Sequence, residues 1–257
     1  MKEERRIVMN GELQDLCDLA LSANRALKEK SVLETESAPY ILSRKFIFSE
    51  QFGFAGSAKQ WFSVSVKRGM HAVNLIVPVK YEKRGHLGFA NESRAYLVLY
   101  RKDRGPSVLA PFWNYDQQKK GWNITYRERE WVDKPVEPPV FADETEAFEA
   151  VLKEIEDLAE EIHEPFFASR FSTAGKILAG KAEMEHKRTA ELPEPYGRIL
   201  EAVTCSDVFG GMGSWNDCPP FEAREIGRGE DYERLSDELL RCSRACLMYA
   251  VNTCYLR

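Results

Sequence analysis

The loop from Gly210 to Asp217 is the segment whose residue types and spacing could most readily support binding or catalysis. It combines three glycines with a tryptophan and three hydrogen-bonding side chains. Glycine permits positive φ angles and close backbone approach, so such a loop can direct amide N–H groups at an anion or form a pocket wall. Six residues are therefore candidate ligand contacts: Gly211, Gly213, Ser214, Trp215, Asn216 and Asp217.

This loop matches no known catalytic or nucleotide-binding motif. It lacks the terminal Gly-Lys-Ser/Thr of a phosphate-binding P-loop, and Ser214 lacks the flanking glycines of a nucleophile elbow. A hydrolase or transferase with its pocket at this loop is one alternative function, and the sequence identifies no catalytic residue for it. A structural role competes with it: a glycine ends a helix, Trp215 fills the core and Asp217 caps the following turn.

Five of the six cysteines lie after residue 200. Cys242 and Cys246 have i,i+4 spacing, which would place two thiolates on one helix face beside a metal ion. Neither a Cys-x-x-Cys pair nor a neighbouring histidine accompanies them, and cysteines in an apolar stripe usually pack as small core residues. The sequence therefore predicts no metal site and no cofactor.

Two Glu-x-x-His units, Glu160 with His163 and Glu183 with His186, have the spacing found in di-iron carboxylate bundles. Such a site also needs two inward glutamates on further long helices, and the apolar faces of this chain carry none. The surrounding sequence is so rich in glutamate that these pairs arise easily. We interpret both as solvated surface residues.

Charge is divided unevenly along the chain. Residues 40–134 contain 17 Lys and Arg against 8 Asp and Glu, whereas residues 135–257 contain 13 against 25. Two regions of opposite net charge create electrostatic fields that influence association with other molecules more than they influence the fold. They predict docking of a protein partner, with Glu154, Asp157 and Glu161 as the candidate acidic face.

The basic segment interleaves aromatic residues with cations. Its aromatic residues are Trp61, Trp113, Tyr115, Trp122 and Tyr126, and its cations are Lys59, Arg101, Lys102, Arg104, Lys119, Lys120, Arg127 and Arg129. Bases stack on aromatic rings while cations neutralise phosphates, so a sheet of this composition could bind single-stranded nucleic acid. The overall isoelectric point of about 5.6 disfavours this second alternative, because dedicated nucleic-acid binders are usually basic.

Strand patterns dominate the first half of the chain after one predicted helix over residues 11–30. Beyond Pro39 apolar residues recur at every second position, which predicts about six strands joined by short turns. They lie near residues 40–48, 62–66, 73–79, 95–100, 108–115 and 122–131. Arg68-Gly69 is interpreted as the hairpin turn between the second and third.

Helical patterns follow a proline-rich segment at residues 133–140. An apolar stripe from Phe148 to Ile162 predicts the strongest helix, and Pro165 suits the first position of the next. Two more helices are predicted near residues 195–207 and 230–254. The expected fold class is α+β: an N-terminal helix, an antiparallel sheet of about six strands, and about four C-terminal helices packing on one face of it.

We favour a single domain over residues 1–257. The alternative divides the chain into a basic part, 1–134, and an acidic part, 140–257, with a linker at 133–140. Either arrangement is long enough to bury a full core.

These features together favour a non-enzymatic binding or accessory protein that acts through protein–protein contacts. Bacterial immunity proteins, which neutralise basic nuclease toxins, use similar charge fields, although the likeness is of charge and not of motif. No apolar run approaches the ~20 residues that span a bilayer, and the first residues lack the apolar core of a secretory signal. The sparse cysteines fit reduced thiols, so we expect a cytoplasmic protein without membrane contacts.

Overall fold

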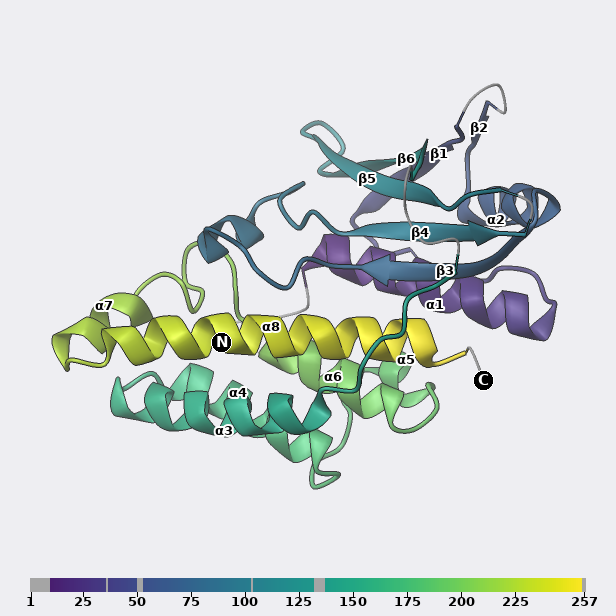
Figure 1. The fold of residues 1–257 in the computed structure, drawn as a ribbon. Coiled ribbons are helices and arrows are strands. Elements are labelled where there is room, and N and C mark those ends of the chain that lie inside the picture. The colour runs from purple at the N-terminus through teal and green to yellow at the C-terminus, as the bar shows by residue number, and fades with distance from the viewer. Residues whose placement is uncertain (1–9, 36, 50–52, 103, 132–136, 256–257) are drawn as a thin grey trace. The chain divides into compact units, whose positions relative to one another are not determined.

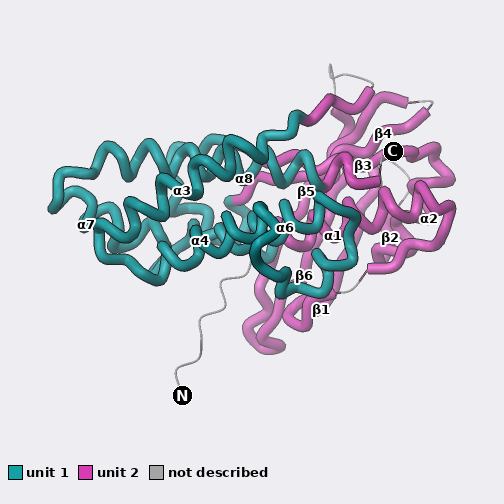
Figure 2. Tube along the Cα trace, turned by 90° about the horizontal axis from the view of Figure 1, so that it is seen from below, with its two compact units in different colours: residues 1–11, 78–92, 142–250 teal, residues 12–77, 93–141, 251–257 magenta. Residues whose placement is uncertain are grey.

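Two compact units make up the chain, and each is assembled from segments far apart in the sequence (Figure 2). The computed structural model describes residues 10–35, 37–49, 53–102, 104–131 and 137–255. The helical unit comprises residues 1–11, 78–92 and 142–250, and the sheet unit comprises residues 12–77, 93–141 and 251–257. The predicted α+β class is confirmed. Much of the predicted linker lies outside the described residues, and the single domain stays a prediction.

Six strands form one sheet in the order β2-β1-β6-β5-β4-β3. Their bounds are β1 Ile41–Ile47, β2 Phe54–Ala55, β3 Met70–Ile76, β4 Tyr96–Arg101, β5 Ser107–Asp116 and β6 Gly121–Glu130. Strands β3 to β6 form the predicted antiparallel meander, but β1 pairs with β6 in parallel, so the sheet is mixed. No hairpin joins β1 to β6, so turn geometry does not fix their relative direction.

The predicted strand at residues 62–66 is wrong, because this segment lies within helix α2, Ala58–Lys67. Ser57 is the N-cap and accepts a hydrogen bond from the Gln60 backbone N–H at 3.2 Å. Trp61 and Phe62 are buried, and the alternating valines that suggested a strand are largely exposed or half-buried. Helix capping and tertiary burial therefore override the alternating pattern, and Arg68 is the helix C-cap, not part of a hairpin.

Helix α1, Gly11–Glu29, packs on one face of the sheet (Figure 1). Asp15 of α1 accepts a hydrogen bond from the buried Tyr126 hydroxyl of β6 and forms an ion pair with Arg44 of β1. Phe46 stacks between Tyr126 and Trp61, with ring centroids 4.8 and 5.2 Å away. This face of the sheet therefore holds the aromatic core.

Two asparagine side chains complete the outer edge of β3. Asn24 bonds both backbone groups of Val73, at 2.6 Å to the carbonyl and 3.0 Å from the N–H. Asn252 does the same for Leu75, at 2.9 and 2.7 Å. Each amide takes the place of a neighbouring strand, which satisfies groups that would otherwise template edge-to-edge pairing.

The helical unit contains the predicted C-terminal helices and two further short ones. Their bounds are α3 Thr145–Glu161, α4 Pro165–Leu178, α5 Lys187–Ala190, α6 Tyr196–Ser206, α7 Pro219–Glu225 and α8 Gly229–Thr253, with a 3₁₀ helix, η2, at Arg84–Gly88. The last residues of α8, 251–253, belong to the sheet unit. The apolar stripe predicted for α3 is buried, and Pro165 opens α4 as expected.

Candidate functional site

The glycine-rich loop is anchored by Trp215, which is fully buried in the helical unit. Its ring packs edge-on against Phe167 and Phe171 of α4 at centroid distances of 5.2 and 5.3 Å. Its indole N–H donates to Ser236 of α8 at 2.8 Å, and its carbonyl accepts from the Tyr232 hydroxyl at 2.7 Å. The tryptophan thus joins α4 and α8 as a core residue.

Polar groups of the same loop bond to the loop's own backbone. Asp217 accepts from the N–H of Gly213 at 2.7 Å, and Ser214 accepts from the N–H of Asn216 at 3.2 Å. Gly88 of η2 lies so close to this loop that an added Cβ would be 2.3 Å from the Gly211 nitrogen. These contacts favour the structural role, and ligand binding at Gly210 to Asp217 stays a prediction.

The acidic face expected on α3 is partly neutralised by arginines of α8. Glu154 forms an ion pair with Arg234 at 3.3 Å, and Glu161 with Arg228. Asp157 is exposed. Two of the three carboxylates chosen from the sequence therefore already have cationic partners.

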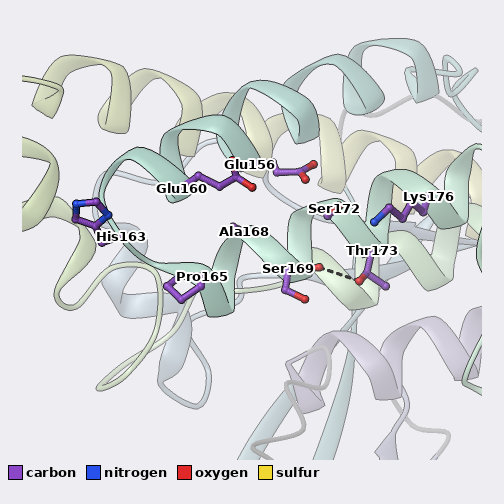
Figure 3. A pocket seen from close by; sticks show the side chains of 9 residues that line it. All are labelled: Glu156, Glu160, His163, Pro165, Ala168, Ser169, Ser172, Thr173 and Lys176. Carbon is purple, nitrogen blue, oxygen red and sulfur yellow. Dashed lines mark hydrogen bonds between the residues drawn. The ribbon is translucent and has the colours of Figure 1, made fainter.

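The opposite flank of α3 borders an open pocket of 540 Å³, which we call the α3–α4 pocket (Figure 3). Its floor and walls come from the end of α3, the connecting turn and one face of α4. The lining residues are Glu156, Glu160, His163, Pro165, Ala168, Ser169, Ser172, Thr173 and Lys176. Because 156, 160 and 163 have spacings of four and three, they share one side of the helix, away from Glu154 and Glu161.

Charge in this pocket is predominantly negative. Glu160 is exposed and Glu156 is half-buried, and neither forms an ion pair with any residue that the structure describes. Lys176 is the cation on the opposite wall, where the hydroxyl of Thr173 donates to the Ser169 carbonyl at 2.8 Å (Figure 3). The α3–α4 pocket thus offers two free carboxylates and several hydroxyl groups to a ligand.

Two exposed aromatic residues lie on α4 and α7. Glu164 precedes α4, and burial together with the adjacent Glu222 of α7 raises the pKa of Glu164. Phe166 and Phe221, next to these carboxylates in the sequence, are 43% and 63% exposed. We call these four residues, Glu164, Phe166, Phe221 and Glu222, the aromatic end; Pro165 of the pocket wall lies between Glu164 and Phe166 in the sequence.

The two Glu-x-x-His units have different surroundings. Glu160 and His163 both line the α3–α4 pocket. His186 instead pairs with the buried Glu201 of α6, whose Oε1 lies 2.9 Å from the imidazole Nδ1, and Glu183 takes no part in that contact. Sequence spacing missed Glu201 because it lies on a different element. Over the described ranges, histidines, cysteines and carboxylates form no cluster suited to a metal ion.

Five of the six cysteines are buried, and Cys218 is exposed. Burial raises the pKa of Cys242, and it raises that of Cys246 to about 12. Such thiols stay protonated and pack as apolar groups, in agreement with the core role expected for this pair.

The interleaved aromatic residues and cations of the basic segment separate onto different faces. Trp61, Trp113 and Tyr126 are buried on the face that carries α1, whereas Arg127 and Arg129 point away from it because strand residues alternate. Three of the five aromatic residues are therefore covered, Tyr115 is 40% exposed, and nucleic-acid binding stays a prediction. Two exposed phenylalanines, Phe54 and Phe112, lie on the same face as the arginines.

No family model, no curated protein and no solved structure matches this chain significantly. Among the described residues, the helices are each too short or too polar to cross a membrane. Functional inference consequently rests on the geometry of the chain alone.

Proposed function

We propose that this chain is a binding protein whose helical unit docks a basic segment of a partner protein in the α3–α4 pocket. The observation that carries the proposal is the pair of unneutralised carboxylates, Glu156 and Glu160, in the α3–α4 pocket, with exposed Phe166 directly after the lining residue Pro165 in the chain. Lysine or arginine side chains would meet the carboxylates, and an apolar side chain beside them would pack on the aromatic end.

The arrangement of charge explains why this flank suits a partner better than the face chosen from the sequence. Glu154 and Glu161 already contact Arg234 and Arg228, so a partner cation must compete with an arginine there. At Glu156 and Glu160 it displaces only water. Complementary charge of this kind sets orientation and association rate, and the buried aromatic contacts supply most of the affinity.

A matched pair of double variants tests this role. Fluorescence anisotropy would measure binding of a labelled peptide that places lysines and arginines around a tryptophan, with a glutamate-containing counterpart as the reference. We expect Glu156→Gln with Glu160→Gln to weaken binding about fivefold, since each exposed charge contact contributes up to about 1 kcal/mol. Phe221→Ala should weaken it further.

The control variant, Glu154→Gln with Glu161→Gln, removes the same charge from the same helix. It should leave peptide binding within about twofold, because those carboxylates already have intramolecular partners. Equal losses in both double variants would show that net charge and not the pocket attracts the peptide. Equal binding of the glutamate peptide would show that the carboxylates do not select a basic segment. Either result would reject the pocket as the docking site.

The alternative of a hydrolase or transferase at the glycine-rich loop has less geometric support. A nucleophile or base there needs a free side chain, whereas Ser214 and Asp217 both accept hydrogen bonds from loop N–H groups. We therefore propose binding as the function of this protein.

A further inference from the structure

The sheet face opposite α1 is exposed across β2, β1, β6 and β5. Strand pairing sets its rows: Lys45 lies beside Thr125, and Thr125 lies opposite Phe112. In the next row Arg127 lies between Ile47 and Ala110. We call this surface the open face; toward β3 and β4 it ends at a separate cluster of buried residues, Ala72, Val98 and Tyr100.

Three exposed cations stand on the open face: Lys45, Arg127 and Arg129. None of them forms an ion pair with a carboxylate in the part of the chain that the structure describes. The Lys45 ammonium lies 4.5 Å from the centroid of the Phe54 ring, which holds the cation over the sheet by a cation–π contact. The cations are therefore available to an anionic partner.

Two large aromatic side chains share this face. Phe112 is 56% exposed and Phe54 is 61% exposed. Arg127 is the diagonal neighbour of Phe112 across the β5–β6 pair, a separation of about 7–8 Å that long side chains span. A flat aromatic ring next to a cation is the combination on which a nucleic-acid base stacks while its phosphate is neutralised.

Carboxylates are kept off the open face. In the paired rows, the remaining positions on this side are Ser43, Asn114, Asn123 and Val108. Asp116 lies at the β5–β6 turn, where its carboxylate accepts hydrogen bonds from the N–H groups of Gln118 and Lys119. Asp15 and Glu128 point to the other face and are buried in ion pairs. The sheet unit carries 18 Lys and Arg against 13 Asp and Glu, so its net charge is positive.

We propose that the open face binds single-stranded nucleic acid, with a base stacked on Phe112 and phosphates held by Lys45, Arg127 and Arg129. An exposed sheet with aromatic rings and cations accepts unpaired bases, whereas a duplex hides its base faces. This binding site is distinct from the α3–α4 pocket and does not depend on the function proposed for it.

Anisotropy titrations of the full chain with labelled oligo-dT and oligo-U of about 12 nucleotides test this proposal. We expect binding that weakens steeply between about 50 and about 200 mM salt. Arg127→Gln with Arg129→Gln should reduce the salt slope by about 1.4, since each phosphate contact on a single strand contributes about 0.7. Phe112→Ala should weaken binding about tenfold and leave the slope unchanged.

Lys119→Gln with Lys120→Gln is the matched control, because it removes the same charge from the exposed β5–β6 turn and not from the open face. Its affinity should stay within about twofold of the unmodified chain. All substituted positions are exposed, and circular dichroism would verify that each variant is folded.

Absence of binding at low salt would overturn the proposal. A second pair of results would also overturn it: polyglutamate competes with the oligonucleotide as well as unlabelled oligonucleotide does, and Phe112→Ala leaves the affinity unchanged. Together these results would identify the open face as a docking site for acidic proteins. Duplex DNA binding as tightly as oligo-dT would also overturn it, because stacking needs unpaired bases.

Discussion

Ion pairs are mostly buried in the sheet unit and mostly exposed in the helical unit. Glu128 of β6 accepts hydrogen bonds from Arg101 at 2.6 Å and Arg68 at 2.9 Å, and the Arg101 and Glu128 side chains are 2% and 1% exposed. The pair of Glu154 with Arg234, which joins α3 to α8, is 57% and 52% exposed. The helical unit also has one buried ion pair, Arg244 with Asp207. The contrast is therefore between the buried pairs of the sheet unit and the exposed pairs that join α3 to α8.

The contrast shows how the two units acquire surfaces of opposite sign. In the sheet unit, Glu128 and Asp15 are buried together with their arginine partners, and Lys45, Arg127 and Arg129 remain on the open face. In the helical unit, arginines of α8 are covered by acids of α3, and surplus carboxylates remain outside. Net charge along the sequence therefore indicates the sign of each surface but does not indicate which charges are free.

The largest expected effect is at Glu128. Substituting Glu128→Gln removes the carboxylate that pairs with buried Arg101 and with Arg68, and burial with neighbouring Arg68 already lowers the pKa of Arg101. We expect the free energy of unfolding to fall by about 3 kcal/mol or more. Urea denaturation measures this loss.

Glu130→Gln on the same strand is the control, because Glu130 is exposed, and it should change stability by less than about 0.5 kcal/mol. Similar losses in the two variants would mean that the sheet unit does not depend on its buried ion pairs, and the contrast between the units would disappear.

A second expected effect concerns Tyr232, the buried phenol that bonds Trp215 in the helical unit. Burial raises its pKa to about 12 from a usual value of 10.0, so the folded chain keeps the proton that the unfolded chain loses. The resulting stability is fully present below pH 10 and is lost between pH 10 and 12, at about 1.4 kcal/mol per pH unit. In total, this stabilisation is about 3 kcal/mol.

Urea unfolding of the unmodified chain and of Tyr232→Phe, at about pH 8 and about pH 11, measures this contribution. The variant should lose about 1 kcal/mol at the lower pH, because the hydrogen bond to the Trp215 carbonyl is gone, and should depend less on alkaline pH. An unchanged pH dependence in Tyr232→Phe would show that other groups cause the alkaline loss.

Much of the fold follows from local patterns in the sequence, and the exceptions have physical causes. The stripe from Phe148 to Ile162 repeats at helical spacing for four turns, so α3 is predicted correctly. The alternation at residues 62–66 is short, and one capping serine together with burial of Trp61 is enough to make it a helix. The parallel pairing of β1 with β6 joins strands separated by the whole meander, which local patterns do not encode.

The candidate sites could be predicted only in part. Side chains alternate along β5, so Phe112 and Trp113 lie on opposite faces of the sheet. Assigning each aromatic residue to a face of the sheet therefore predicts the exposed ring of Phe112. Glu160 and His163 were noticed for their spacing, but their pocket exists only because α4 packs beside α3. Neutralisation of Glu154 by Arg234 links positions 80 residues apart, which sequence spacing cannot show.

The smallest expected effect is at the exposed α3–α8 pairs. Substituting Glu154→Gln or Glu161→Gln should lower the free energy of unfolding by less than about 1 kcal/mol, because exposed ion pairs are hydrated and screened. Glu149→Gln, at an exposed position of α3 without an ion pair, is the reference. A double-mutant cycle of Glu154 with Arg234 gives the coupling directly, and about 1 M salt should abolish it. A coupling above about 2 kcal/mol would mean that the α3–α8 ion pairs stabilise the fold as strongly as the buried pairs of Glu128. The double variant Glu154→Gln with Glu161→Gln would then no longer be a structurally neutral control for docking at the α3–α4 pocket.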